Sequence, residues 1–247
     1  MNRLYTALLL VVFTVTACGS LPKDVGAERR LQLSHSVVRL KGDSGAGGTG
    51  FSVRSPSGEV YTMTNSHVCA LANSDGLLHA DSPLWEGARS IKVMSVSKTA
   101  DLCLLEPIHE LTPVLAAQSL DTARRLYAYG HPRLSGQTLS EGFVVERKDI
   151  DLADEDTPLD QCNGPGRRVE VVQNFIFAAP MCIVKRDAWL TSLVIHPGSS
   201  GSPVVNDAGN LVGVMFAGMS DTGYGAMVPV ERVLEFFTEA LMLANGA

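Results

Sequence analysis

Apolar residues alternate with polar ones in many short runs along the chain, and this two-residue period predicts β-strands. In the first half the predicted strands are 36–41, 49–54, 59–64, 90–96 and an apolar run that begins at residue 102. In the second half they are 126–129, 137–147, 169–177, 181–184, 189–194, 202–205, 211–216 and 223–229. Residues 230–243 differ, because their apolar side chains recur at helical spacing. The pattern predicts an all-β fold that ends in an amphipathic α-helix.

The N-terminal residues do not follow this pattern. Arg3 is followed by an apolar segment, residues 7–15, that is too short to span a bilayer, and then by the tetrad V-T-A-C that ends at Cys18. The tetrad resembles the lipobox of bacterial lipoproteins. That resemblance implies that residues 1–17 are a signal peptide and that lipid on Cys18 anchors the protein to a membrane. A signal peptide with an incidental cysteine is the alternative.

Residues 18–31 are small and polar, and we expect them to form a tether ahead of one folded domain, 32–247. In the sorting pattern of lipoproteins, an aspartate directly after the lipidated cysteine is typical of inner-membrane retention, and this chain has Gly19 at that position. We therefore expect a protein of the bacterial cell envelope, lipid-anchored in the outer membrane and facing the periplasm.

Composition narrows the function further. The 247 residues carry a net charge of −6 without a block of like charges. The composition therefore gives no sign of binding to nucleic acid or to an anionic membrane surface. Apart from Cys18, the chain holds four cysteines, an even number that suggests two disulfides among three possible connectivities: Cys69, Cys103, Cys162 and Cys182. A zinc site is the competing interpretation, but neither C-x-x-C nor H-E-x-x-H spacing supports it. We expect no metal and no cofactor.

The stretch 196–203 reads H-P-G-S-S-G-S-P, and its glycines permit a tight turn. Such a turn can expose a serine hydroxyl and aim backbone N–H groups at a developing oxyanion. An ordinary loop between strands is the alternative. Two upstream residues bear on this choice. His67 follows a predicted strand, and Asp101 opens an apolar strand, where a buried carboxylate needs a donor such as His67.

Three motifs together resemble the trypsin-like serine proteases and lie closest to their bacterial HtrA-like branch. They are G-T-G-F at 48–51 with T-N-S-H-V at 64–68, T-A-D-L-C-L-L at 99–105, and G-S-S-G-S-P at 198–203. The resemblance implies a chymotrypsin-like fold of two six-stranded antiparallel β-barrels, at about 32–115 and 124–229, followed by the helix 230–243. It also implies a catalytic triad of His67, Asp101 and Ser200, with the backbone N–H groups of Gly198 and Ser200 as the oxyanion hole.

The same resemblance favours one disulfide connectivity. If His67 and Asp101 meet, Cys69 and Cys103, each two positions further on, are drawn together as well. Cys162 and Cys182 would then close the acidic stretch 149–166, which is longer than the family's minimum and which we expect to be irregular.

By resemblance, the primary specificity pocket is lined by uncharged residues, namely Val194, Ile195, Phe216, Ala217 and Gly218. The sequence therefore predicts a serine endopeptidase of envelope or extracellular proteins that cleaves after small or medium apolar residues through an acyl-enzyme. Two alternatives remain open: a catalytically silent, protease-like binding module, and an esterase with the same triad. The residues after Pro229 are too few for a PDZ domain, so we expect none. No feature of the sequence indicates an oligomeric state.

Overall fold

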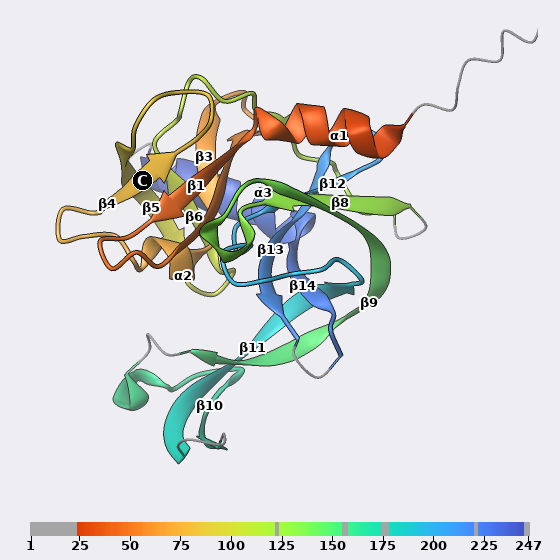
Figure 1. Ribbon diagram of the computed structural model, residues 1–247. Helices are drawn as coiled ribbons and strands as arrows, with labels where there is room; N and C mark the ends of the chain where they lie inside the picture. The colour runs from red at the N-terminus through yellow and green to blue at the C-terminus, as the bar shows by residue number, and fades with distance from the viewer. Residues whose placement is uncertain (1–23, 122–123, 155–157, 174–177, 220–221, 245–247) are drawn as a thin grey trace, which may run out of the picture.

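The first half of the chain closes into a β-barrel. The computed structural model describes residues 24–121, 124–154, 158–173, 178–219 and 222–244 (Figure 1). Six strands pair in the ring β1-β4-β5-β6-β3-β2-β1, and every pairing in it is antiparallel. Their bounds are β1 Val37–Lys41, β2 Gly47–Arg54, β3 Val60–Thr64, β4 Leu77–Asp81, β5 Arg89–Ser97 and β6 Leu102–Leu105. The short strand β7 (Val114–Leu115) adds to β2 in parallel.

The second half forms another antiparallel ring, with the order β8-β9-β11-β14-β13-β12-β8. Its strands are β8 Arg125–Gly130, β9 Thr138–Asp154, β11 Ala178–Thr191, β12 Pro203–Asn206, β13 Leu211–Gly218 and β14 Gly225–Pro229. Helix α3 (Val230–Ala244) follows β14 directly. The predicted architecture of two six-stranded barrels and a C-terminal helix is therefore confirmed.

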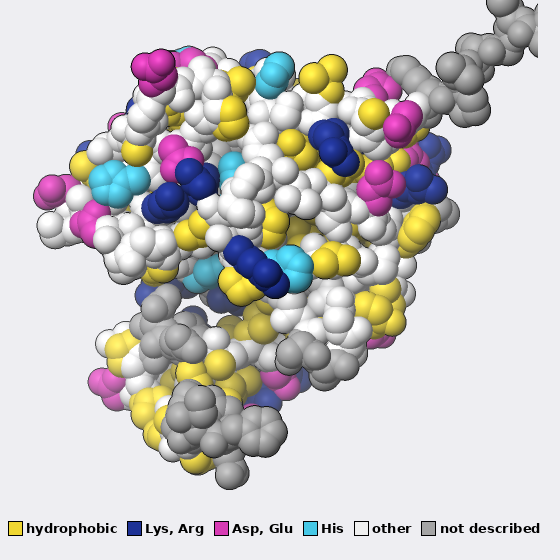
Figure 2. All heavy atoms as spheres, viewed as in Figure 1, with side chains coloured by type: hydrophobic (Ala, Val, Ile, Leu, Met, Phe, Trp, Pro, Cys, Tyr) yellow, Lys and Arg dark blue, Asp and Glu magenta, His cyan; other side chains and the backbone are white. Residues whose placement is uncertain are grey.

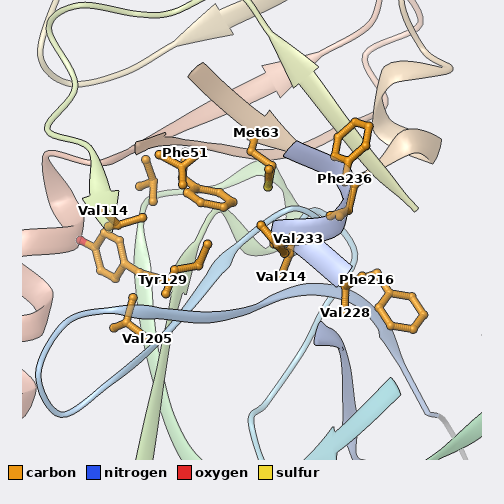
Figure 3. Close-up of a cluster of buried hydrophobic side chains, with 14 of the residues drawn as sticks. Phe51, Met63, Val114, Tyr129, Val205, Val214, Phe216, Val228, Val233 and Phe236 are labelled. Atoms are coloured by element: carbon orange, nitrogen blue, oxygen red, sulfur yellow. The ribbon is translucent and has the colours of Figure 1, made fainter. Parts of the chain in front are cut away.

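A shared apolar core joins the two barrels and α3. Phe51 and Met63 of the first barrel belong to one buried cluster with Val214 of the second barrel and Phe237 of α3. Figure 3 shows side chains of this cluster pointing toward one another from both barrels and from the helix. Burial of this apolar surface fixes how the two barrels sit against each other, and any site between them depends on it.

Two segments outside the predicted strands are strands. Strand β4 lies between the predicted strands 59–64 and 90–96, where buried Leu78 and Ala80 flank exposed His79. Strand β9 continues through Asp154, so the prediction of an irregular segment from residue 149 was wrong. Ile150 is buried between two aspartates, and this short alternation marks a strand despite the acidic composition.

An arm projects from the second barrel (Figure 1). We define the arm as β10 (Arg167–Gln173) with the paired outer parts of β9 and β11, from Cys182↔Asp154 to Asp187↔Asp149. A short 3-10 turn, Leu159–Gln161, and the disulfide Cys162–Cys182 close its end. In the space-filling view a hollow separates the arm from the body of the molecule (Figure 2).

The expected tether is helical over part of its length. Helix α1 (Val25–Ser34) begins at the N-cap Asp24, whose side chain accepts a hydrogen bond from the Ala27 N–H at 3.1 Å. Leu33 is fully buried in the shared core, so apolar packing docks the helix against the domain. The predicted signal peptide 1–17 and Cys18 lie outside the described residues. Within the described ranges, no helix is long and apolar enough to cross a membrane.

Replacing Leu33 with alanine tests whether α1 belongs to the folded domain. We expect Leu33→Ala to lower the free energy of unfolding by about 2–5 kcal/mol, because it leaves a cavity in the core. The matched control is Leu31→Ala, since Leu31 is 67% exposed on the same helix, and it should change stability by no more than about 0.5 kcal/mol. Chemical denaturation measures both. Equal effects of the two substitutions would contradict the docked helix.

Candidate active site

His67 lies on a single helical turn, and two links attach this turn to the start of β6. The turn, α2 (Ser66–Cys69), follows β3 directly. The disulfide Cys69–Cys103 ties it to β6, and the Asn65 side-chain amide donates to the Asp101 carbonyl at 2.9 Å. These links bring His67 beside Asp101. The two disulfides pair the cysteines as the sequence analysis favoured.

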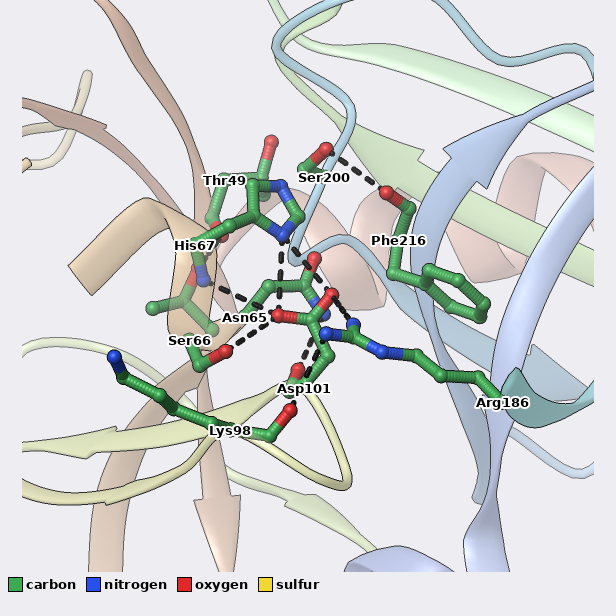
Figure 4. Close-up of polar contacts among 10 residues, drawn as sticks. Thr49, Asn65, Ser66, His67, Lys98, Asp101, Arg186, Ser200 and Phe216 are labelled. Carbon is green, nitrogen blue, oxygen red and sulfur yellow. Dashed lines mark hydrogen bonds and ion pairs between the residues drawn. The ribbon is translucent and has the colours of Figure 1, made fainter. Parts of the chain in front are cut away.

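The Asp101 carboxylate is only 1% exposed and is surrounded by donors (Figure 4). Its Oδ1 accepts from the Ser66 hydroxyl at 2.7 Å and from the His67 backbone N–H at 3.2 Å. The Nδ1 of His67 lies 3.1 Å from Oδ1 and 3.0 Å from Oδ2. Asp101 itself has φ +53°, a left-handed backbone conformation that aspartate tolerates better than most residues. The backbone and four short contacts therefore orient one buried carboxylate toward one imidazole.

Arg186 also binds this carboxylate, and the sequence analysis did not anticipate it. The arginine lies on β11 at the base of the arm, and its Nη1 is 2.7 Å from Oδ2 of Asp101. Burial is the largest single influence and raises the pKa of Asp101, but His67, Arg186 and Ser66 together hold that pKa below its ordinary value. Asp101 is therefore ionised at neutral pH. In the sequence, Arg186 lies in a short run of charged residues between the predicted strands 181–184 and 189–194, so no pattern signals this contact.

The loop 196–203 crosses the barrel interface and is tied to both sides of it. Thr49 of β2 donates through its hydroxyl to the Gly198 carbonyl at 2.9 Å, and its N–H donates to the Ser200 carbonyl at 2.7 Å. Gly198 has φ +90°, and a Cβ there would lie 2.6 Å from the His131 carbonyl oxygen. Only glycine fits this conformation and this approach. The loop therefore presents Ser200 at the interface, on the side where His67 and Asp101 lie.

Ser200 is partly exposed, and its hydroxyl is turned toward the second barrel. Its Oγ donates to the Phe216 carbonyl at 3.4 Å, a long hydrogen bond (Figure 4). The two side chains Ser200 and His67 are not hydrogen-bonded to each other in this conformation. The structure brings His67 and Asp101 into contact and places Ser200 near them, without a hydrogen bond between Ser200 and His67.

The backbone around Ser200 leaves two donors unused. The Pro197 carbonyl accepts a hydrogen bond from the Arg133 N–H at 2.5 Å. Because carbonyl and N–H point in opposite directions across a trans peptide, the Gly198 N–H points away from Arg133. Within the part of the chain that the structure describes, neither this N–H nor that of Ser200 donates to a protein atom.

A cavity of about 500 Å³ opens beside Ser200. Met219, Tyr224 and His196 line it, together with four of the five residues expected in the specificity pocket: Ile195, Phe216, Ala217 and Gly218. Val194 does not line this cavity: it is 62% exposed and, together with Ile195, lines a second cavity beside β8 and β9.

Comparisons with known proteins agree with this fold. A family model described as a trypsin-like peptidase domain matches residues 48–214. The chain is 26% identical over 190 residues to the putative serine protease HhoB of Synechocystis sp., covering 74% of this chain and 38% of that protein. It is also 26% identical over 183 residues to Protease Do-like 1, chloroplastic, of Arabidopsis thaliana, covering 70% of this chain and 35% of that protein. The chain thus spans less than two fifths of either relative.

Among solved structures, the active form of the Rv3671c protease from M. tuberculosis superposes with a TM-score of 0.63 at 22% identity, covering 87% of this chain and 85% of that one. The double barrel defines the chymotrypsin-like fold, and the family match extends over more than half of the chain. The chain therefore belongs to the trypsin-like peptidase domain family of serine proteases.

Proposed function

We propose that this protein is a serine endopeptidase that cleaves protein or peptide substrates through an acyl-enzyme. The observation that carries the proposal is the buried, ionised Asp101 in contact with the His67 imidazole, beside a glycine-rich loop that exposes Ser200. In this account Ser200 is the nucleophile, His67 the general base and acid, and Asp101 the group that orients the imidazole and stabilises its charged form.

The chemistry begins with a rotation of Ser200 about χ1, which exchanges its long hydrogen bond to the Phe216 carbonyl for one to Nε2 of His67. Oγ then attacks the scissile carbonyl carbon while its proton passes to Nε2. Because Nδ1 of His67 faces the two Asp101 oxygens at 3.1 and 3.0 Å, that nitrogen carries a proton and Nε2 is free to accept one. The imidazolium next protonates the leaving amine, and water attacks the ester by the same steps in reverse.

The N–H groups of Gly198 and Ser200 are suited to bind the oxyanion. The hydrogen bond from the Arg133 N–H to the Pro197 carbonyl supports an orientation of this peptide in which the Gly198 N–H points away from Arg133. Each donor of this kind lowers the barrier by about 3–4 kcal/mol. Ser199 stands where related zymogens carry an aspartate that pairs with a new N-terminus, so we propose that the loop needs no such cleavage to become ordered.

The cavity beside Ser200 favours small or medium apolar residues before the scissile bond. Ile195 packs closely enough that a Cβ at Gly225 would lie 2.7 Å from its Cγ1, so the isoleucine limits the depth of the cavity. Among the residues that the structure describes, no lysine, arginine, aspartate or glutamate lines it. A substrate ammonium or guanidinium group would lose its hydration there without a compensating charge.

We propose that the enzyme acts in the bacterial cell envelope, anchored by lipid on Cys18 to the outer membrane and facing the periplasm. The V-T-A-C tetrad supports the anchor, and two disulfides are typical of an oxidising compartment. We expect the full chain to incorporate radiolabelled palmitate in a bacterial host and Cys18→Ser to lose that label. Equal labelling of both proteins would contradict the anchor.

Ser200→Ala tests the nucleophile. We expect wild type to react with a fluorophosphonate probe and to cleave unfolded protein substrates, and the variant to lose labelling and about 10⁵- to 10⁶-fold in kcat. The matched control is Ser202→Ala, which removes a neighbouring buried hydroxyl that has no hydrogen-bond partner among the described residues. The control should keep its activity.

The alternatives give different results in the same assay. A folded wild-type protein that the probe does not label would contradict the proposal and favour a silent binding module. A labelled protein that hydrolyses small esters but no peptide bond would favour an esterase.

Ile195→Ala tests the pocket. We expect the shortened side chain to deepen the cavity and to raise kcat/KM for leucine or phenylalanine, relative to alanine, before the scissile bond by about 10- to 100-fold. Val194→Ala is the control, because Val194 lies outside the cavity, and its preference should equal that of wild type. Cleavage of a peptide library by the three proteins measures the preference. A shift in Val194→Ala alone would assign the specificity pocket to the second cavity.

A further inference from the structure

One contact of the candidate site crosses from the second barrel to the first at the buried carboxylate. Arg186 extends from β11 and places Nη1 2.7 Å from Oδ2 of Asp101, which precedes β6 of the first barrel. The two side chains are 14% and 1% exposed, so little water screens the pair. Charge-assisted hydrogen bonds of this length are among the stronger contacts in proteins.

The two oxygens of Asp101 are bound by different parts of the molecule. Oδ1 accepts from Ser66 and from the His67 N–H, both within the first barrel. Oδ2 faces Arg186 of the second barrel. The Nδ1 of His67 lies almost equally far from both oxygens, at 3.1 and 3.0 Å, so a rotation of the carboxylate would change its contact with the imidazole. Ser66 restrains one end of this carboxylate and Arg186 restrains the other (Figure 4).

Arg186 is itself held in place. Its Nη2 donates to the Lys98 carbonyl at 3.2 Å, while the Lys98 ammonium group points away from the carboxylate (Figure 4). Its Cζ lies 6.0 Å from the centre of the Phe216 ring. Its backbone pairs with Ile150 of β9, and the next residue, Asp187, forms an ion pair with Arg147. The guanidinium is therefore presented by a paired strand rather than by a free loop.

We propose that Arg186 is a positioning residue of the triad, which binds Oδ2 of Asp101 from the second barrel and so sets the orientation of that carboxylate toward His67. The inference rests on the proposed serine protease activity, since it concerns the same site. Arg186 touches neither substrate nor the reacting atoms and acts through Asp101. Its guanidinium also offsets part of the carboxylate charge that faces the imidazole. Arg186 therefore weakens the electrostatic interaction between Asp101 and the His67 imidazolium as well as orienting Asp101.

Several of the other charged groups near Arg186 have ion-pair partners of their own. A cavity of about 230 Å³ beside it is lined by five further ionisable side chains from β11 and α3: Lys185, Asp187, Arg232, Glu235 and Glu239. Asp187 pairs with Arg147, and Arg232 pairs with Glu235. Besides Arg186, His67 is the titratable side chain in direct contact with Asp101 among the described residues. Loss of the Arg186 charge would therefore change the electrostatic interaction of the Asp101–His67 pair first.

The experiment compares wild type, Arg186→Met, Arg186→Lys and Arg168→Met. Arg168→Met is the matched control, because Arg168 forms an ion pair with Asp151 at 2.9 Å on the same arm without touching the triad. The rate constant for phosphonylation of Ser200 by a fluorophosphonate, with fluoride as the leaving group, is measured against pH, and kcat and KM are measured on one peptide substrate. Thermal unfolding reports whether each variant is folded.

We expect Arg186→Met to lower kcat and the phosphonylation rate constant by about 10- to 100-fold with little change in KM, as for other partners that orient a catalytic group. The acid limb of its pH profile should move up by about one pH unit, because the imidazolium then faces an uncompensated carboxylate. Arg186→Lys keeps a positive charge and should recover part of the rate with the acid limb near that of wild type. Arg168→Met should match wild type in rate and in profile.

A folded Arg186→Met variant with the rate and acid limb of wild type would overturn the inference. Equal losses in Arg186→Met and Arg168→Met would overturn it too, because they would indicate a general effect of the arm. If Arg186→Met does not fold, Arg186→Gln takes its place, since glutamine keeps a hydrogen-bond donor without the charge. An acid limb of Arg186→Gln at the same pH as that of wild type would then overturn the inference. A wild type that is not phosphonylated on Ser200 would instead overturn the proposed function.

Discussion

The burial of one carboxylate constrains the whole candidate site. Asp101 is 1% exposed and ionised, and an ionised group removed from water must be surrounded by donors. The structure supplies those donors from two barrels: Ser66 and His67 from the first, and Arg186 from the second. The site therefore exists only when the barrels are docked, and the shared apolar core that docks them is part of its construction.

The loop that carries Ser200 also depends on contacts from the opposite barrel. It belongs to the second barrel, yet Thr49 of the first barrel binds the carbonyls of both Gly198 and Ser200. The base and its carboxylate are thus steadied by an arginine of the opposite barrel, and the nucleophile loop by a threonine of the opposite barrel. Reciprocal contacts of this kind hold the parts of a catalytic site at fixed distances more strictly than a loop alone would.

The sequence predicts those features that depend on local pattern. The strands follow from the alternation of apolar residues, and the spacing of cysteines from His67 and Asp101 favoured the disulfide connectivity that the structure contains. Features that depend on tertiary contact were missed. Arg186 meets Asp101 only because β11 approaches the start of β6, and α1 is docked by Leu33 although the helix is mostly polar. Which side chains line the cavity beside Ser200 is likewise a tertiary property: Ile195 lines it, whereas Val194 lines only the second cavity.

The central claim is that the docked barrels pre-arrange His67, Asp101 and the loop around Ser200 for acyl transfer. A crystal structure of the wild-type protein after reaction with a fluorophosphonate tests it most directly. We expect phosphorus bonded to Ser200 Oγ, a phosphoryl oxygen within hydrogen-bond distance of the Gly198 and Ser200 N–H groups, and Asp101 still bound by His67 and Arg186. Phosphorus on another residue, or a Gly198 N–H turned away from the phosphoryl oxygen, would contradict it.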